Sequence, residues 1–256
     1  MTYDNVLVSR DGDHATITLN RPQQRNALSL QHLQELTKAF EEVAATDATG
    51  IVVAANGPVF SAGHDFRDVG GKDLDEVRFL LQTCADLMTL VQLVPQVVIA
   101  KVHGLATAAG AQLVATCDLA VAADTAGFAA PGGKGGWFCH TPMVAIARDI
   151  GRKRALELAL TGDVIDAATA LDWGLVNRVV PAADLDAATR DLLTAATRGS
   201  RRSKATGKSA LYAQLSMGQD DAYRYAVDVM AQASQTPDAQ EGVAAFLDKR
   251  HPVWQP

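Results

Sequence analysis

Two short segments of small residues could together bind a carbonyl oxygen that becomes negatively charged. The first, His103 to Asp118 (HGLATAAGAQLVATCD), predicts a glycine turn and a helix that begins near Ala108-Ala109-Gly110. The first turn of a helix offers unpaired backbone N–H groups at the positive end of the helix dipole, and both favour an oxyanion. Ala and Gly are equally suited to close packing of a helix on a sheet. This segment alone therefore leaves both interpretations open.

The second segment favours the oxyanion. It runs from Gly57 to Phe66 (GPVFSAGHDF), directly after the apolar run 51–55, and Ser-Ala-Gly before His64 predicts another small-residue turn. The backbone N–H of His64 can then point outward. Because two such amides from different elements make an oxyanion hole, we expect the two turns to meet at one carbonyl oxygen.

Composition limits the kind of protein that carries these turns. The 256 residues, 48% hydrophobic and 20% charged, predict a globular chain with one sizeable core. A net charge of −6 argues against a nucleic-acid partner. The three cysteines have no metal-type spacing and cannot all pair, which indicates a reducing compartment and no metal site. The start MTYDNVLVSRDG does not resemble a leader, and no apolar run is long enough to predict a membrane span, so we expect a cytoplasmic protein without a membrane partner.

Periodicity and capping signals predict the elements that position the two turns. A hairpin at 6–19, a helix capped by Ser29 and a buried strand at 50–55 precede the first turn. Asp73 with Glu76 predicts a capping box and a long helix that leads to a strand at 97–102. The later pattern is mostly helical, with helices expected at 143–149, 152–160, 167–173, 184–197, 204–215, 222–235 and 238–249. We expect a β-rich α/β core over 1–185 and a helical C-terminal region over 186–256.

The chain resembles the crotonase (enoyl-CoA hydratase/isomerase) superfamily in four segments that occur in the family's order: LNRPQQRNAL, PVFSAGHDF, IAKVHGLATAAGAQLVATCDLAVAADTAGFAAP and LTGDVIDAATALDWGLVNRVVP. The resemblance implies the crotonase (ClpP-like) α/β fold, a spiral of ββα units with a helical C-terminal trimerisation region. It also implies a homotrimer or a hexamer made of two trimers. The implied ligand is an acyl-CoA whose thioester oxygen binds the backbone N–H groups of His64 and Ala109, with no cofactor beyond this CoA thioester substrate.

The same resemblance implies where CoA lies. Its adenine and pantetheine would run along Gln24, Arg25, Asn26, Ala62, Asp65, Phe66 and Arg67. Arg25 and Arg67 either meet the phosphates or are ordinary surface residues. Ala109 stands where the family most often has glycine, so its methyl group would tighten the hole slightly. The imidazole of His64 is expected to be incidental, because the family uses the amide at that position.

The acid–base positions depart from the family pattern. Typical hydratases hold and activate water between two glutamates, and this sequence has Gln112 and Gly132 at those positions. Glutamine can orient a water molecule but cannot accept a proton at neutral pH, and glycine can do neither. The segments AAGAQL, APGGKGG and WFCHTP are similar to the subgroup called enoyl-CoA hydratase domain-containing protein 3.

A replacement for the glutamates is sought among the neighbouring residues. His140 is the candidate, because imidazole is the side chain best suited to proton transfer at neutral pH, with an ordinary surface or core histidine as the alternative. Cys139 beside it is either a partner or a packed thiol. We therefore predict an acyl-CoA-processing enzyme of fatty-acid metabolism, a lyase of the enoyl-CoA hydratase type that stabilises a thioester enolate. The alternatives are another CoA-thioester reaction, such as decarboxylation or hydrolysis, and a non-catalytic acyl-CoA-binding protein.

Overall fold

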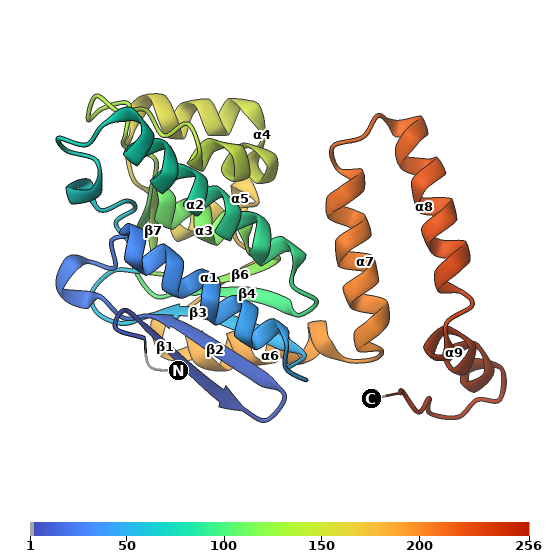
Figure 1. The fold of residues 1–256 in the computed structure, drawn as a ribbon. Coiled ribbons are helices and arrows are strands. Elements are labelled where there is room, and N and C mark those ends of the chain that lie inside the picture. Colours follow the sequence, from blue (N-terminus) through green and yellow to red (C-terminus); the bar gives the residue numbers. More distant parts are fainter. Residues whose placement is uncertain (1–2, 256) are drawn as a thin grey trace.

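The structure, a computed structural model, describes residues 3–255 and is built around a six-stranded sheet of order β1-β2-β3-β4-β6-β9 (Figure 1). β1 and β2 form an antiparallel hairpin, and each later strand pairs in parallel with its neighbour. The strands are β1 (Val6–Asp11), β2 (His14–Leu19), β3 (Gly50–Ala55), β4 (Val97–Val102), β6 (Leu119–Ala123) and β9 (Arg178–Val180). The parallel pairing requires crossover connections, and the helices supply them.

Helices cover both faces of this sheet. α1 (Leu30–Ala44), α2 (Leu74–Leu93) and α3 (Ala109–Thr116) contribute to the larger core on one face. α6 (Leu185–Thr197) lies on the other face, where Leu193 packs with Ile99 of β4. Because side chains alternate along a strand, Val98 and Ala100 face the larger core while Ile99 faces α6. The uninterrupted apolar strands of the sequence are thus explained by burial on both faces.

A smaller sheet carries the connection that leads into α3. It consists of β5 (Ala106–Thr107), β7 (Gly127–Ala129) and β8 (Ile165–Asp166), in the order β5-β7-β8. It is followed by α5 (Ala167–Trp173), which ends at Gly174 in a left-handed conformation with φ 91°. The two predicted helices at 143–149 and 152–160 are present within α4 (Pro142–Thr161), and they are separated by a kink at Gly151, whose φ of 75° and ψ of 166° are not helical.

The last helices extend beside the core, at the right of Figure 1. They are α7 (Arg201–Gln214), α8 (Gln219–Ala233) and α9 (Pro237–Leu247). α7 begins three residues before the predicted start at 204, because Ser200 caps it by accepting a hydrogen bond from the Ser203 N–H. Lys208 joins α7 to the core through an ion pair with Asp118, at 2.8 Å. The boundary at residue 185 stays a prediction.

Short 3₁₀ turns complete the chain: η1 (Pro22–Gln24), η2 (Phe66–Asp68) and η3 (Ala182–Asp184). The two predicted helix starts near the site are confirmed. Ser29 accepts from the His32 N–H, and Asp73 and Glu76 form the reciprocal capping box of α2. Within residues 3–255, no helix is both long enough and apolar enough to cross a bilayer.

Candidate active site

The turn before His64 packs directly on the N-terminal end of α3. Gly63 has φ 87°, and a Cβ atom built on it would lie 2.9 Å from the Cβ of Ala108 and 3.3 Å from the backbone N of Ala109. The Thr107 N–H donates to the Ser61 carbonyl at 2.9 Å, and a parallel bridge joins Ser61 to Ala106. The two segments that the sequence singled out therefore lie against each other.

The backbone amides of His64 and Ala109 have no acceptor among the hydrogen bonds described for residues 3–255. Leu28 bonds to the groups on either side of His64, donating to the Gly63 carbonyl at 2.7 Å and accepting from the Asp65 N–H at 3.2 Å. The N–H of His64 consequently faces away from Leu28. Ala109 is the first residue of α3, where the N–H has no partner within the helix. Both donors remain available to a ligand.

Ala108, between β5 and α3, has an unusual backbone conformation. Its φ of 49° and ψ of −119° lie in a region that residues with a Cβ atom seldom occupy. The surrounding contacts hold it there, since its N–H donates to the Ala129 carbonyl at 2.9 Å and its carbonyl accepts from Gln112 at 2.9 Å. Strain of this kind, held by neighbours, is characteristic of functional sites. Here it turns the chain so that α3 begins with a free amide at Ala109.

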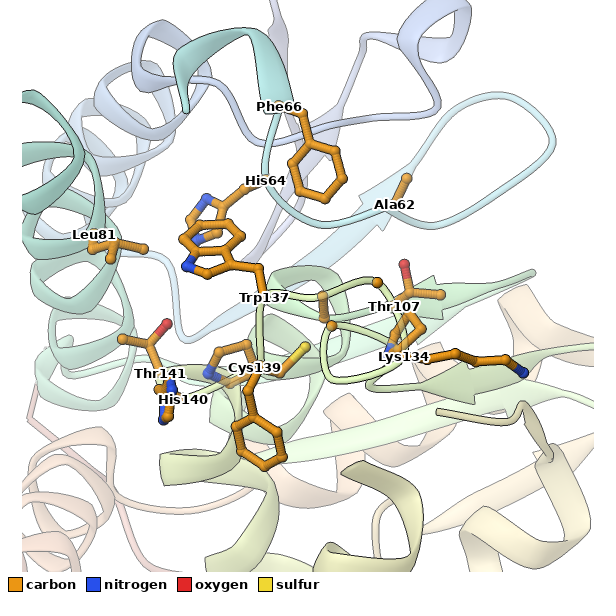
Figure 2. A pocket seen from close by; sticks show the side chains of 16 residues that line it. Ala62, His64, Phe66, Leu81, Thr107, Lys134, Trp137, Cys139, His140 and Thr141 are labelled. Atoms are coloured by element: carbon orange, nitrogen blue, oxygen red, sulfur yellow. The ribbon is translucent and has the colours of Figure 1, made fainter. Parts of the chain in front are cut away.

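A cavity of about 470 Å³ lies beside these two turns (Figure 2). This volume suits a small organic group. None of its lining side chains is a carboxylate, and those that can exchange a proton are His64, Lys134, Cys139 and His140. The lining residues are Ala62, His64, Phe66, Leu81, Thr107, Ala108, Pro131, Gly132, Lys134, Gly135, Trp137, Phe138, Cys139, His140, Thr141 and Pro142.

Aromatic rings form much of the wall. The Trp137 ring lies 6.3 Å from the His64 ring and 6.2 Å from the Phe66 ring, the latter edge-on, as Figure 2 shows. The Phe138 and His140 rings are 5.0 Å apart. Sequence reasoning did not single out Trp137 or Phe138 as lining residues. Their position directly after a run of glycines could have indicated this role, because glycines have no side chains with which to line a cavity.

Gly132, one of the two predicted glutamate positions, has no room for a side chain. A Cβ atom built there would lie 2.1 Å from the Trp137 carbonyl oxygen and 2.7 Å from Cys139 Sγ. The loop closes on itself at this point, since the Trp137 N–H donates to the Gly132 carbonyl at 2.8 Å. At the other position, Gln112 is buried in α3 and its Oε1 has no hydrogen-bond partner among the described residues.

The titratable groups of the cavity differ in their surroundings. Burial raises the pKa of the Cys139 thiol, which stays protonated at neutral pH, whereas burial lowers the pKa of His64. His140 is exposed while Cys139 beside it is buried, so the two side chains point in different directions. Lys134 is exposed and forms an ion pair with Asp163 at 3.1 Å. His140 thus lines the cavity, but Cys139 does not form a nucleophile–base pair with it.

The residues predicted to follow CoA divide into two groups. Gln24, Arg25, Ala62, Phe66 and Arg67 are exposed, and Ala62 and Phe66 among them line the cavity. Asn26 is fully buried and ties neighbouring loops together, because its Nδ2 donates to the carbonyls of Asn56 at 2.7 Å and Val59 at 3.0 Å. Its side chain is therefore occupied by the fold.

Asp65 is likewise engaged within the protein. Its carboxylate accepts from the Arg67 guanidinium at 2.7 Å and from Arg21 at 3.3 Å, and it caps η2 through the Arg67 N–H. The hydrogen bond from Arg67 is the main reason that the pKa of Asp65 falls to about 2. Arg67 is thus held in place at the rim by Asp65.

Comparisons with known proteins identify the class to which this fold and cavity belong. A family model described as enoyl-CoA hydratase/isomerase matches residues 11–256. The crystal structure of an enoyl-CoA hydratase from Mycobacterium smegmatis matches with a TM-score of 0.94 at 43% identity, over 98% of each chain. The crystal structure of human enoyl-CoA hydratase domain-containing protein 3 matches with a TM-score of 0.94 at 41% identity, over 98% of this chain and 100% of that one.

A curated relative agrees with these structures. Enoyl-CoA hydratase domain-containing protein 3 of Xenopus laevis is 46% identical over 242 residues, which cover 93% of this chain and 82% of the relative. The chain therefore belongs to the enoyl-CoA hydratase/isomerase family. The resemblance read from the sequence, including its subgroup, and the crotonase fold are confirmed.

The expected cytoplasmic location is wrong. The relatives from Xenopus, mouse and human are all named as mitochondrial proteins. The expectation failed because unpaired thiols exclude an oxidising compartment but do not distinguish one reducing compartment from another. Among the described residues, no group of three or more His, Cys, Asp or Glu side chains is arranged to hold a metal ion.

Proposed function

We propose that the cavity binds an acyl-CoA thioester, with the thioester oxygen on the backbone N–H groups of His64 and Ala109. Two observations support this proposal: Gly63, the residue before His64, packs against Ala108 and Ala109, and neither the His64 nor the Ala109 N–H has an acceptor among the described hydrogen bonds. Donors fixed in advance at the place where negative charge develops stabilise an enolate or oxyanion without reorganising. CoA would reach the cavity past the exposed rim of Gln24, Arg25, Ala62, Phe66 and Arg67.

The reaction is that of an acyl-CoA enzyme of fatty-acid metabolism that forms a thioester enolate, with no cofactor beyond its substrate. Two-glutamate hydration is disfavoured, because Gln112 and Gly132 replace the carboxylates and the cavity lining contains no other. The absence of carboxylates from the lining residues favours, as a second candidate, a CoA-thioester reaction that relies mainly on the oxyanion hole, such as decarboxylation or hydrolysis. A non-catalytic acyl-CoA-binding protein is the remaining alternative.

The test removes one donor. Ala109→Pro deletes the N–H at the first helical position and should lower any thioester turnover by roughly 10²–10³. Folding of the variant must be checked by circular dichroism, because Ala108, with ψ −119°, lies outside the range preferred before proline. Ala109→Gly keeps the N–H and is the matched control. Turnover would be measured on a panel of CoA esters, with calorimetric binding of the same esters. Binding without turnover would favour the non-catalytic alternative, and equal turnover by a folded Ala109→Pro protein would refute the oxyanion assignment.

We also propose that α8 and α9 pack against further copies of the chain in a trimer or a hexamer. Three large side chains of α8, Tyr223, Val227 and Met230, share one helical face and are exposed, as are Phe246 and Leu247 of α9. Several large apolar side chains exposed on neighbouring turns of a helix are characteristic of a protein interface. The resemblance to a superfamily with a C-terminal trimerisation region supports another copy as the occupant.

A further inference from the structure

The described lining of the cavity offers few ways to accept a proton. Without a carboxylate, the groups are His64, Lys134, Cys139 and His140. Lys134 is a cation paired with Asp163, and the buried Cys139 remains a thiol because burial raises its pKa. The two imidazoles are left, and their surroundings differ: His140 is exposed, while His64 is largely enclosed by protein.

The two ring nitrogens of His64 are buried, although the residue as a whole is only half-buried. Neither Nδ1 nor Nε2 makes a well-aligned hydrogen bond within residues 3–255, although the backbone of Leu28 lies close enough to affect the pKa of the ring. A buried polar atom without a good partner is costly, so a ring of this kind that lines a cavity is suited to contact a ligand there. Burial lowers the pKa of His64, opposed to a smaller extent by the nearby Leu28 backbone and by Asp68, so the ring is neutral at pH 7 and one nitrogen carries a lone pair.

The ring also lines the cavity that is proposed to receive the acyl group. The N–H of His64 is proposed to bind the thioester oxygen. The α-carbon of the acyl group, which is bonded to the thioester carbonyl carbon, would then lie near the His64 side chain. Figure 2 shows the His64 ring beside the Trp137 indole, which belongs to a loop containing Gly133, Gly135 and Gly136. An acyl group that displaces the indole would meet the imidazole.

We infer that the imidazole of His64 is the proton acceptor of the cavity and takes a proton from the α-carbon of a bound acyl-CoA thioester. This inference rests on the proposed function, since the amides of His64 and Ala109 must hold the thioester. In the step, the lone pair of the ring nitrogen bonds to the proton, and the electron pair of the C–H bond moves into the enolate, whose charge lies on the thioester oxygen. With the acyl group bound, the imidazolium exchanges its proton with solvent and returns a proton to the same carbon, or a deuteron in D₂O. The ring and the thioester are regenerated, so no other reactant is consumed.

The experiment follows exchange of the α-protons of butyryl-CoA in D₂O by mass spectrometry. His64→Ala keeps the backbone N–H and removes the ring, so a purely backbone role predicts no loss. The inference predicts a loss of roughly 10²–10⁴ in the exchange rate with little change in the calorimetric affinity for butyryl-CoA. Added imidazole should restore part of the exchange. His251→Ala, which removes an exposed histidine outside the cavity lining, is the matched control.

The pH profile separates the ring from a merely structural role. The wild-type exchange rate should rise with pH to a plateau, with a midpoint below the ordinary histidine value, and His64→Ala should lack this rise. The charged and titratable groups near the ring are Asp68 and, across the cavity, Lys134, Cys139 and His140. Should His64→Ala fold poorly, His64→Asn provides a second variant that cannot accept the proton.

The outcomes distinguish the inference from the proposed function. Wild-type protein that does not bind butyryl-CoA removes the proposed function and the inference together. Wild-type protein that binds but shows no exchange, or a His64→Ala protein that exchanges at the wild-type rate, overturns the role of the imidazole alone. Loss of exchange with retained binding and rescue by imidazole supports it.

Discussion

Gly132→Ala should destabilise the protein, although it adds only one methyl group. That methyl carbon would lie 2.1 Å from the Trp137 carbonyl oxygen, whereas an ordinary contact between a carbon atom and a carbonyl oxygen is roughly 3.3–3.6 Å. The loop from 132 to 139 must therefore move by roughly 1 Å or more. Cys139 Sγ, at 2.7 Å from the same methyl position, would also have to move.

The magnitude follows from two costs. Overpacking of this kind costs about 1–3 kcal/mol, and loss of the hydrogen bond from the Trp137 N–H to the Gly132 carbonyl costs about 0.5–1.5 kcal/mol. We expect a decrease of about 2–4 kcal/mol in the free energy of unfolding, which for a chain of this size lowers the melting temperature by about 4–16 °C.

Differential scanning calorimetry of Gly132→Ala beside Gly135→Ala measures this effect. Gly135 lies in the same loop, but a Cβ atom there would meet its nearest neighbour, the Gly132 carbonyl oxygen, at an ordinary 3.7 Å. Gly135→Ala should therefore melt close to the wild type. Equal melting temperatures for the two variants would refute the view that Gly132 is required by space, and a glutamate could then be accommodated at this position.

Three further predictions concern other parts of the molecule. The wild type should hydrate crotonyl-CoA slowly, and Gln112→Glu should accelerate this hydration, because it restores one carboxylate with little change in side-chain size. A wild-type turnover typical of enzymes, about 10 s⁻¹ or more, would contradict this prediction. Burial lowers the pKa of His32 to about 4, which favours the neutral ring in the folded state. The advantage of the wild type over His32→Gln in urea unfolding should therefore be largest above pH 6.5 and decrease by about 3 kcal/mol towards pH 4, and a constant difference would refute it. Light scattering should give at least three times the 27.0 kDa mass of the chain, and Met230→Asp, on the exposed face of α8, should weaken this assembly; a monomeric wild type at micromolar concentration would exclude it.

The parts of the fold that depend on local signals could be predicted from the sequence. The hairpin, the capped start of α2 and the buried strands follow from turn residues, caps and apolar runs that act within a few residues. The start of a helix is predicted less accurately where its first turn consists of polar residues. α7 begins at Arg201 because Ser200 caps it, and the four polar residues that follow show no apolar periodicity.

Contacts between loops could not be predicted in this way. The two small-residue turns were recognised by their composition, but the positive φ of Ala108 is accompanied by a hydrogen bond to Ala129, which lies in a separate strand, β7. The obstacle at Gly132 is the Trp137 carbonyl, which reaches this position only because the loop folds back on itself.

The surroundings of Gly132 and of His64 both indicate which reaction the cavity suits. At Gly132 the loop backbone fills the space into which a carboxylate would extend, so a single change of residue cannot restore a second glutamate. At His64 a neutral, unpartnered imidazole lines the cavity beside the amide proposed to hold the thioester. A hydratase must deliver a proton and a hydroxide to adjacent carbons and therefore needs a positioned water, whereas enolate formation needs one acceptor beside an oxyanion hole. The described groups suit the second requirement better than the first, which is why proton exchange at the α-carbon is a more direct test of this cavity than hydration.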